Sequence, residues 1–146
     1  IRRLSKERKV AMSDRQPDLE KRTEAFFSAI TLGDWQAAAD QIHPEAVAIQ
    51  NIVGKETDAR ELLQSMRGMV ESLDSLRYEN VRRVVGNDAV VEQHDVCMTR
   101  KDGLEVRLDV CIILGFDPAG IIIRIDEYLD SAAAARLLVG GDSNRA

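Results

Sequence analysis

Aromatic side chains are scarce in this sequence, at 4% of its 146 residues, and cysteine and histidine occur only twice each. Cys97 and Cys111 cannot supply a disulfide framework, and no Cys or His cluster has the spacing of a metal site. No apolar run approaches the ~20 residues that a bilayer-spanning helix needs. We therefore expect an aliphatic core, no metal, no membrane span and a reduced, cytoplasmic protein.

Charge is unevenly distributed along the chain. The sequence has 20 basic and 25 acidic side chains, a formal net charge of −5. The first sixteen residues hold six basic and two acidic side chains, so they carry +4 and the remainder carries −9. An acidic body argues against a nucleic-acid partner, because phosphate binding needs a basic face. We predict a flexible basic tail over residues 1–16. Met12 resembles a natural start, so we expect residues 1–11 to be an upstream extension or not native.

Periodic apolar residues predict three helices in the N-terminal half. Pro17 suits the first turn of a helix, Gly33 suits its end, and Asp34 suits the N-cap of the next helix. Apolar residues at helical spacing predict helices over 17–32, 35–42 and 58–73. A turn is expected at 43–45 and a short strand over 47–51.

After Ser75 the pattern changes to β-rich segments separated by turn residues. Strands are predicted over 78–85, 89–100, 104–116 and 121–130, with an Ala-rich helix over 131–138. Helices followed by a meander of antiparallel strands indicate an α+β fold, expected as one domain over 17–139 with a disordered tail over 140–146. Twisted strands leave a concave space beneath the helices, where small ligands commonly bind.

The Asp102-Gly103 pair is the strongest hairpin signal, because a two-residue type I′ turn needs positive φ at both central positions. Such a turn pairs Asp95 with Val110 and Gln93 with Ile112, and paired residues point to the same side of a sheet. The side that contains Val110 is wholly apolar, so it is the inner one. Its members are Leu108, Val110, Ile112, Leu114 and Phe116. We therefore predict that Asp95 and Gln93 face inward.

The last predicted strand brings a second carboxylate to the same face. Glu127 is the only charged residue in an apolar alternation formed by Ile121, Ile123, Ile125 and Leu129. A four-residue loop over 117–120 places Glu127 opposite Val110, so its carboxylate and that of Asp95 lie about 10 Å apart across three strands. A three-residue loop with a bulge at Gly120 would instead turn Asp126 inward.

Two carboxylates on an apolar wall are costly unless they are hydrogen-bonded or neutralised. A facing pair titrates in a coupled manner and keeps one proton near neutrality, which supplies a general acid and a general base in one cavity. The alternative is that each is a structural carboxylate, bonded to a backbone N–H, to Gln93 or to Tyr78.

Other polar residues have less specific patterns. Asn51 either holds a water or a substrate oxygen, or ends its strand as a turn residue. On the predicted register His94 faces outward beside Cys111, as a surface or dimer-contact residue. Met66 and Met69 are typical of a core rather than of a ligand site.

The order of elements, together with Phe26-Phe27, Gly33-Asp34-Trp35 and the ending over 123–130, resembles the nuclear-transport-factor-2-like superfamily. This superfamily includes ketosteroid isomerases, SnoaL-like polyketide cyclases and limonene-1,2-epoxide hydrolases. The resemblance covers about residues 17–138. It implies a curved sheet wrapped by helices into a cone with an apolar pocket, and a homodimer packed through the outer sheet face.

Limonene-epoxide-hydrolase-like proteins carry Arg-x-Asp in one strand, a second Asp in the last strand and Tyr-x-Asn in the first. By this resemblance Asp95 and Glu127 match the two acids and Asn51 matches the Asn. Gln93 replaces the Arg that bridges the acids, and Ile49 replaces the Tyr, so the match to an epoxide hydrolase is incomplete.

These inferences predict a small cofactor-free enzyme that acts on an apolar small molecule by carboxylate acid–base chemistry, as in epoxide hydrolysis or SnoaL-like isomerisation or cyclisation. Asp95 is the expected base and Glu127 the expected acid, with Gln93 and Asn51 orienting water or substrate. The expected pocket lining is Ile49, Val110, Ile112, Leu108, Ile125, Phe27 and Trp35. The alternative is a non-catalytic ligand-binding or dimerisation domain of the same fold, which the missing Arg and Tyr favour.

Overall fold

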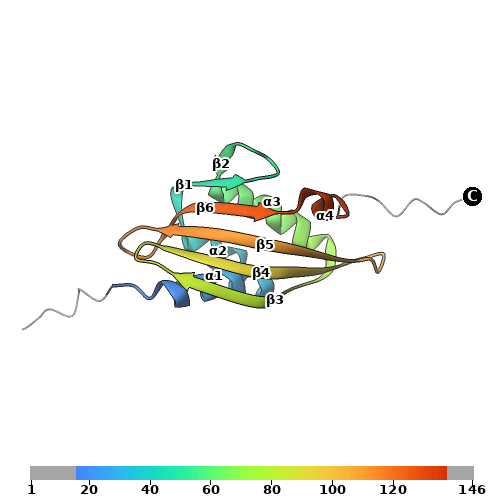
Figure 1. The fold of residues 1–146 in the computed structure, drawn as a ribbon, viewed down its shortest axis with the longest axis horizontal. Coiled ribbons are helices and arrows are strands. Elements are labelled where there is room, and N and C mark those ends of the chain that lie inside the picture. The colour runs from blue at the N-terminus through green and yellow to red at the C-terminus, as the bar shows by residue number, and fades with distance from the viewer. Residues whose placement is uncertain (1–15, 138–146) are drawn as a thin grey trace, which may run out of the picture.

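The computed structural model describes residues 16–137 (Figure 1). The tails predicted over 1–16 and 140–146 lie, except for residue 16, outside the described residues. The helices are α1 (Leu19–Leu32), α2 (Trp35–Asp40), α3 (Ala59–Glu71) and α4 (Ser131–Ala135). The strands are β1 (Ile42–Gln50), β2 (Glu56–Asp58), β3 (Leu73–Val85), β4 (Ala89–Arg100), β5 (Glu105–Phe116) and β6 (Ile122–Leu129). The α+β fold predicted from the sequence is confirmed.

Short polar side chains begin each helix. The carboxylates of Asp18, Asp34, Asp58 and Asp130 accept hydrogen bonds from backbone N–H groups in the first turns of α1, α2, α3 and α4. Gly33 ends α1 in the left-handed conformation, with φ 71°. These caps fix the helix boundaries close to the predicted ones. Pro17, predicted in the first turn, precedes the cap Asp18, and α1 begins at Leu19.

The six strands form one curved sheet in the order β2-β1-β6-β5-β4-β3. The strands predicted as an antiparallel meander, β3 to β6, are antiparallel, and β1 joins the sheet by pairing with β6 in parallel. Residues 43–45 form part of β1 rather than a turn, and the register with β6 shifts between Ile42 and Val47, where an irregularity accommodates Pro44. The edge strand β2 was not predicted. Helices α1, α2 and α3 lie against one face of the sheet (Figure 1).

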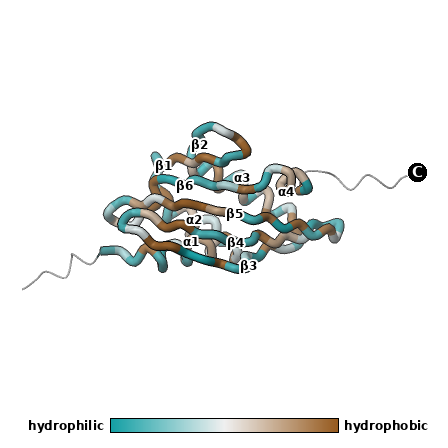
Figure 2. The backbone as a smooth tube through the Cα atoms, in the orientation of Figure 1, coloured by the Kyte–Doolittle hydropathy of each residue, from teal (hydrophilic) through white to brown (hydrophobic). Residues whose placement is uncertain are grey.

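The core lies between the helices and this inner face of the sheet. Fully buried aliphatic side chains come from α1, β1, β5 and β6, among them Ile30, Ile42, Leu114 and Ile122. Figure 2 shows the hydrophobic run along β5 at the centre of the sheet. Within residues 16–137, none of the helices is both long enough and apolar enough to cross a membrane.

The turn between β4 and β5 differs from the predicted one by one residue. Arg100 N–H donates to Leu104 O at 2.9 Å, Gly103 N–H donates to Arg100 O at 2.9 Å, and Gly103 has φ 85°. This is a three-residue loop with a left-handed glycine, the next most common hairpin connection after the two-residue turn. Because side chains alternate along a strand, this one-residue difference exchanges the two faces of β4.

The connection between β5 and β6 contains two irregularities whose effects on the direction of the β6 side chains cancel. Asp117 N–H donates to Ile121 O and Gly120 has φ 81°, so this loop also has three residues rather than the four expected. The register then shifts again between Gly115 and Phe116, which turns Ile123 outward with 41% of its surface exposed. Glu127 therefore faces inward as predicted, opposite Ile112 rather than Val110.

A bulge in β3 changes the direction of its side chains. Glu79 pairs with Asp95 and Arg82 pairs with Gln93, so one extra residue lies in β3 between these pairs. Asn80 lies in the bulge, with φ 52°. Because the bulge reverses the alternation, both Tyr78, before it, and Arg83, after it, point to the inner face.

The left-handed backbone at Asn80 generates a prediction. Glycine adopts this conformation without strain, whereas alanine pays about 1 kcal/mol or more. Both substitutions remove the same side-chain hydrogen bond, so their difference isolates the backbone effect. We expect Asn80→Ala to unfold with a free energy at least about 1 kcal/mol lower than Asn80→Gly in urea titrations. An alanine variant as stable as the glycine variant would show that the positive φ is not required.

Candidate active site between the sheet and helix α3

A cavity of about 370 Å³ lies between α3, α4 and the inner face of the sheet. Its volume falls in the range of about 300–1,000 Å³ that is typical of small-molecule sites. Three residues that the sequence placed in the pocket, Leu108, Val110 and Ile112, line it from β5. Its remaining wall is mostly apolar and includes Leu62, Met66, Met69, Leu76, Val96 and Met98. The cavity therefore suits an apolar ligand.

Four polar side chains from separate strands meet in this apolar wall. Tyr78 comes from β3, His94 from β4, Glu127 from β6 and Gln50 from β1. His94 and Glu127 are buried, with 3% and 7% of their surfaces exposed. A few convergent polar groups in an otherwise apolar cavity are the usual arrangement of a binding or catalytic site.

His94 is held by a second buried carboxylate. Its Nδ1 lies 2.7 Å from Oε1 of Glu92, and both side chains are 1% exposed. Arg83 donates from Nε to the other oxygen of Glu92 at 2.5 Å, and its Nη1 lies 4.0 Å from the exposed Glu24 of α1. Glu92 thus bridges a cation and an imidazole, which satisfies both of its oxygens.

This arrangement fixes which nitrogen of His94 meets the cavity. An ionised carboxylate only accepts hydrogen bonds, so Nδ1 carries a proton and donates it to Glu92. In the described part of the chain, Nε2 of His94 has no hydrogen-bond partner, and no fully buried side-chain nitrogen or oxygen there lacks one. Because His94 lines the cavity and Nε2 has no partner among the described residues, Nε2 is the ring nitrogen available to a ligand there.

Glu127 faces the same space from β6. Gln50 donates from Nε2 to Oε2 of Glu127 at 2.5 Å. Burial raises the pKa of Glu127, although the bond from Gln50 and the proximity of His94 act in the opposite direction. A buried carboxyl with a raised pKa retains its proton at higher pH and can donate it.

Aromatic rings complete the wall around His94. The ring centroid of Tyr78 lies 4.4 Å from that of His94, and the ring of Phe27 lies 5.1 Å from His94 on an edge-to-face approach. Burial, together with nearby Glu127 and Glu92, raises the pKa of Tyr78. Its hydroxyl therefore remains protonated and is available as a hydrogen-bond donor.

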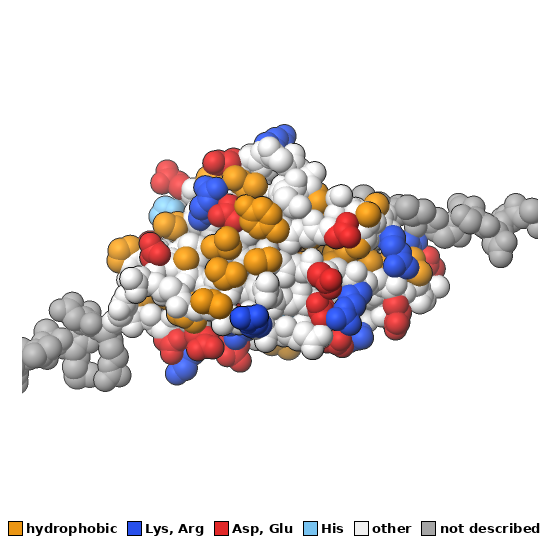
Figure 3. Space-filling model, viewed as in Figure 1, with side chains coloured by type: hydrophobic (Ala, Val, Ile, Leu, Met, Phe, Trp, Pro, Cys, Tyr) orange, Lys and Arg blue, Asp and Glu red, His pale blue; other side chains and the backbone are white. Residues whose placement is uncertain are grey.

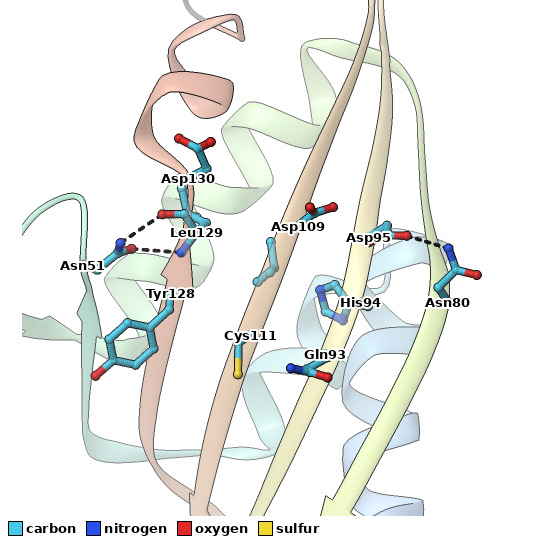
Figure 4. A pocket seen from close by; sticks show the side chains of 11 residues that line it. Asn51, Asn80, Gln93, His94, Asp95, Asp109, Cys111, Tyr128, Leu129 and Asp130 are labelled. Carbon is cyan, nitrogen blue, oxygen red and sulfur yellow. Dashed lines mark hydrogen bonds between the residues drawn. The ribbon is translucent and has the colours of Figure 1, made fainter.

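Asp95 and Gln93 lie on the opposite, outer face of β4 (Figure 4). Asp95 pairs with Asp109 rather than Val110, and it accepts hydrogen bonds from Asn80 and Arg107. The hydrogen bond from Asn80 and the charge of Arg107 lower the pKa of Asp95. The predicted inward direction is wrong because the three-residue loop exchanges the faces, so Asp95 and Glu127 do not form a pair. His94, expected to face outward, faces inward for the same reason.

The remaining predicted residues have scattered positions. Asn51 donates from Nδ2 to Leu129 O at 2.9 Å and accepts from Leu129 N–H at 3.0 Å, so its amide joins the end of β1 to β6 (Figure 4). Ile49 pairs with Asp126 on the outer face, and the neighbouring Gln50 takes the inward position.

The other predicted lining residues lie outside the wall of the main cavity. Trp35 packs against the core. Phe27 and Ile125 line a second, smaller compartment.

A weak signal for the buried pair exists in the sequence. Glu92 and His94 belong to the alternation that also contains Val90, Val96 and Met98, which are apolar. The alternative set, from Val91 to Thr99, is no less mixed, so the alternation did not decide between the two faces. A three-residue reading of the Asp102-Gly103 turn would have placed Glu92 and His94 inside.

Comparison with known proteins agrees with this architecture. The SnoaL-like domain model matches residues 23–125, and the chain belongs to that family. The resemblance to the nuclear-transport-factor-2-like superfamily is thereby confirmed. A search of curated proteins gives no match.

Solved structures of similar fold have low sequence identity to this chain. AclR from Streptomyces galilaeus has a TM-score of 0.71 at 15% identity, over 87% of this chain and 89% of its own. An LEH-like epoxide hydrolase from M. tuberculosis has a TM-score of 0.67 at 19% identity, over 84% and 90%. An NTF2-like protein from Burkholderia xenovorans has a TM-score of 0.68 at 15% identity, over 84% and 97%. At these identities the likeness shows the fold.

Within residues 16–137, no three His, Cys, Asp or Glu side chains are placed to hold a metal ion.

The bridge from Arg83 to Glu92 generates a second prediction. Arg83→Met leaves the buried carboxylate of Glu92 without its cation, which costs about 3 kcal/mol or more in comparable buried pairs. We expect this loss in the free energy of unfolding at neutral pH. We also expect a changed 15N spectrum of the His94 ring, because Glu92 no longer holds Nδ1 in place.

Arg82→Met is the matched control, since Arg82 is exposed and its backbone partner is Gln93 on the outer face. It should leave both the unfolding free energy and the imidazole signals close to those of the wild type. If the two variants behave alike, the bridge does not orient His94.

Proposed function

We propose that this protein is an enzyme that transfers protons on an apolar, oxygen-bearing small molecule, with His94 as the base and Glu127 as the acid. The observation that carries the proposal is that His94 and Glu127 line the same largely apolar cavity. The two groups come from different strands, and their environments differ. Glu92, itself paired with Arg83, holds His94, whereas burial raises the pKa of Glu127. Such divided environments provide an acid and a base in one site.

The reaction that this geometry supports best begins at a carbon next to a carbonyl group. Nε2 of His94 accepts a proton from that carbon, and the electron pair of the C–H bond forms the C=C bond of an enol. Glu127 donates its proton to the carbonyl oxygen as charge develops there, assisted by the hydroxyl of Tyr78. Where a neighbouring double bond extends the enol to a dienol, His94 returns its proton to the far carbon while the enol hydroxyl proton returns to Glu127, which gives isomerisation. In cyclisation, the enol carbon attacks a second carbonyl, whose oxygen takes the proton from His94 while the enol hydroxyl proton returns to Glu127.

Epoxide opening is a second candidate, and it uses the same two residues. His94 would take a proton from water as the water attacks an epoxide carbon, while Glu127 protonates the leaving oxygen. The fold shared with an LEH-like epoxide hydrolase favours this possibility. Asp95 takes no part in either reaction, because it lies on the outer face.

The third prediction tests catalysis by hydrogen exchange, which is measurable on any ketone that enters the cavity. A panel of apolar ketones is incubated with the protein in D2O, and NMR follows deuterium entering the carbons beside the carbonyl. We expect exchange that falls by about 10²- to 10⁴-fold in His94→Gln and Glu127→Gln, the usual contribution of a general acid or base. His43→Gln and Asp109→Asn are the controls, since both residues lie outside the cavity wall.

Stability measurements separate this role from a structural one. Because burial raises the pKa of Glu127, the folded state holds its proton more tightly than the unfolded state does. The wild type therefore has this stabilisation below about pH 4.5 and loses it as the pH rises through the raised value. Glu127→Gln should consequently gain stability relative to the wild type between acid and neutral pH.

A non-catalytic ligand-binding domain is the alternative of a different class. Its support is the largely apolar cavity wall. Ketones or epoxides that bind the wild type and both variants equally, with neither exchange nor hydrolysis, would favour this alternative over the proposed enzyme.

We also propose a homodimer through the outer sheet face, as the superfamily resemblance implies. Figure 3 shows apolar side chains gathered at the centre of this face, with charges of both signs around them. Tyr128, Ile123 and Val84 are 51%, 41% and 58% exposed there. A two-fold interface places such a patch against itself.

Light scattering tests the dimer. We expect the wild type at micromolar concentration to have twice the mass of one chain, and Tyr128→Lys to have the mass of a monomer because it places a like charge on both sides of the interface. A monomeric wild type would contradict the proposal.

A further inference from the structure

Behind Glu127, next to the main cavity, lies the second, smaller compartment of about 20 Å³. Leu62, Met66, Ile112 and Glu127 line both spaces, so they form the boundary between them. Phe26, Phe27, Ala59, Leu63 and Ile125 line the small compartment alone. It lies within the core, between α1, α3 and the sheet.

The size and chemistry of this compartment define what it can hold. A volume of about 20 Å³ is slightly more than the 10–15 Å³ that a water-sized group needs. A buried water also needs two to four polar partners, whereas Glu127 is the only polar side chain in this wall. The compartment therefore suits an apolar group of about the size of a methyl.

The position of Glu127 links this group to the reacting part of the substrate. The hydrogen bond from Gln50 fixes one oxygen of the carboxyl at the boundary of the two compartments. A substrate oxygen that accepts the proton of Glu127 must lie at this boundary. Any group in the small compartment is then attached to the oxygen-bearing carbon or to its neighbour, and the larger part of the molecule extends past His94 into the main cavity.

We infer that the small compartment is a subsite for a methyl group on the carbonyl carbon, and that the substrates are methyl ketones with a larger apolar chain. This inference rests on the proposed function and adds the substrate class to it. It also sets the position of reaction. Because His94 lines the main cavity and not the small compartment, it removes a proton from the chain side of the carbonyl and not from the methyl group.

Three ketones test the subsite: 4-phenylbutan-2-one, 1-phenylpentan-3-one and 1-phenylhexan-3-one. All three carry the same 2-phenylethyl group on one side of the carbonyl and differ only on the other side. These present methyl, ethyl and propyl groups to the small compartment. We expect calorimetry on the wild type to give a Kd about tenfold or more higher for the ethyl than for the methyl ketone. One extra methylene in a fitted apolar pocket usually changes affinity by at least this factor. In D2O, deuterium should enter the CH₂ group of 4-phenylbutan-2-one ahead of its CH₃ group.

Variants of the wall make the test specific. Leu63→Ala enlarges the small compartment alone. The Kd of the ethyl and propyl ketones should therefore fall relative to that of the methyl ketone by tenfold or more. Ile125→Val removes one methylene group from the same wall and should shift the ratio in the same direction, which keeps the test valid if Leu63→Ala folds poorly. Met69→Ala, which changes only the main cavity, should leave the ratio unchanged.

Failure of the subsite and failure of the enzyme proposal have different signatures. Equal affinities across the three ketones in the wild type, or a ratio that neither Leu63→Ala nor Ile125→Val changes, would overturn the subsite whatever the activity. Absence of binding by all three would overturn the substrate class. The expected ratios without deuterium exchange in any ketone would retain the subsite and overturn the catalytic role of His94 and Glu127.

Discussion

The pairing of β4 with β5 is the constraint on which the cavity depends. Backbone hydrogen bonds around the loop over 101–103 set this pairing, and every side chain on β4 takes its direction from it. In the observed register Glu92 lies opposite Ile112, which in turn lies opposite Glu127 on β6. Two acids from different strands therefore share one row of the inner face. A shift by one residue would place Gln93 and Asp95 inside and leave the cavity without an imidazole.

Burial of these polar groups costs solvation free energy, and each group has a partner or an environment that offsets this cost. Glu92 is stabilised by Arg83, and His94 uses the remaining oxygen of Glu92. Glu127 has one hydrogen bond from Gln50, and burial raises its pKa, which favours its neutral form. An apolar set of the same shape would serve stability as well or better. Stability alone therefore does not account for the polar cluster.

Much of the fold could be predicted, because its determinants are local. The aspartate caps, Gly33 and the alternating strands specify the helices and most of the sheet from short segments. The site depended on distant pairings, for which the sequence offers two turn types at Asp102-Gly103. Glu127 was placed correctly because a second bulge, at Ile123, restored the alternation that the preceding loop had changed. The parallel pairing of β1 with β6 had no local signal, so Gln50 was missed.

The bulge at Asn80 also affects how the protein meets other molecules. Strand β3 is an edge of the sheet and presents backbone groups that another extended chain could pair with. Asn80, in a left-handed conformation, breaks the regular row of these groups, and Arg77 and Arg82 place positive charges on either side. The irregularity that lets both Tyr78 and Arg83 point to the inner face thus also discourages edge-to-edge pairing of sheets in aggregates.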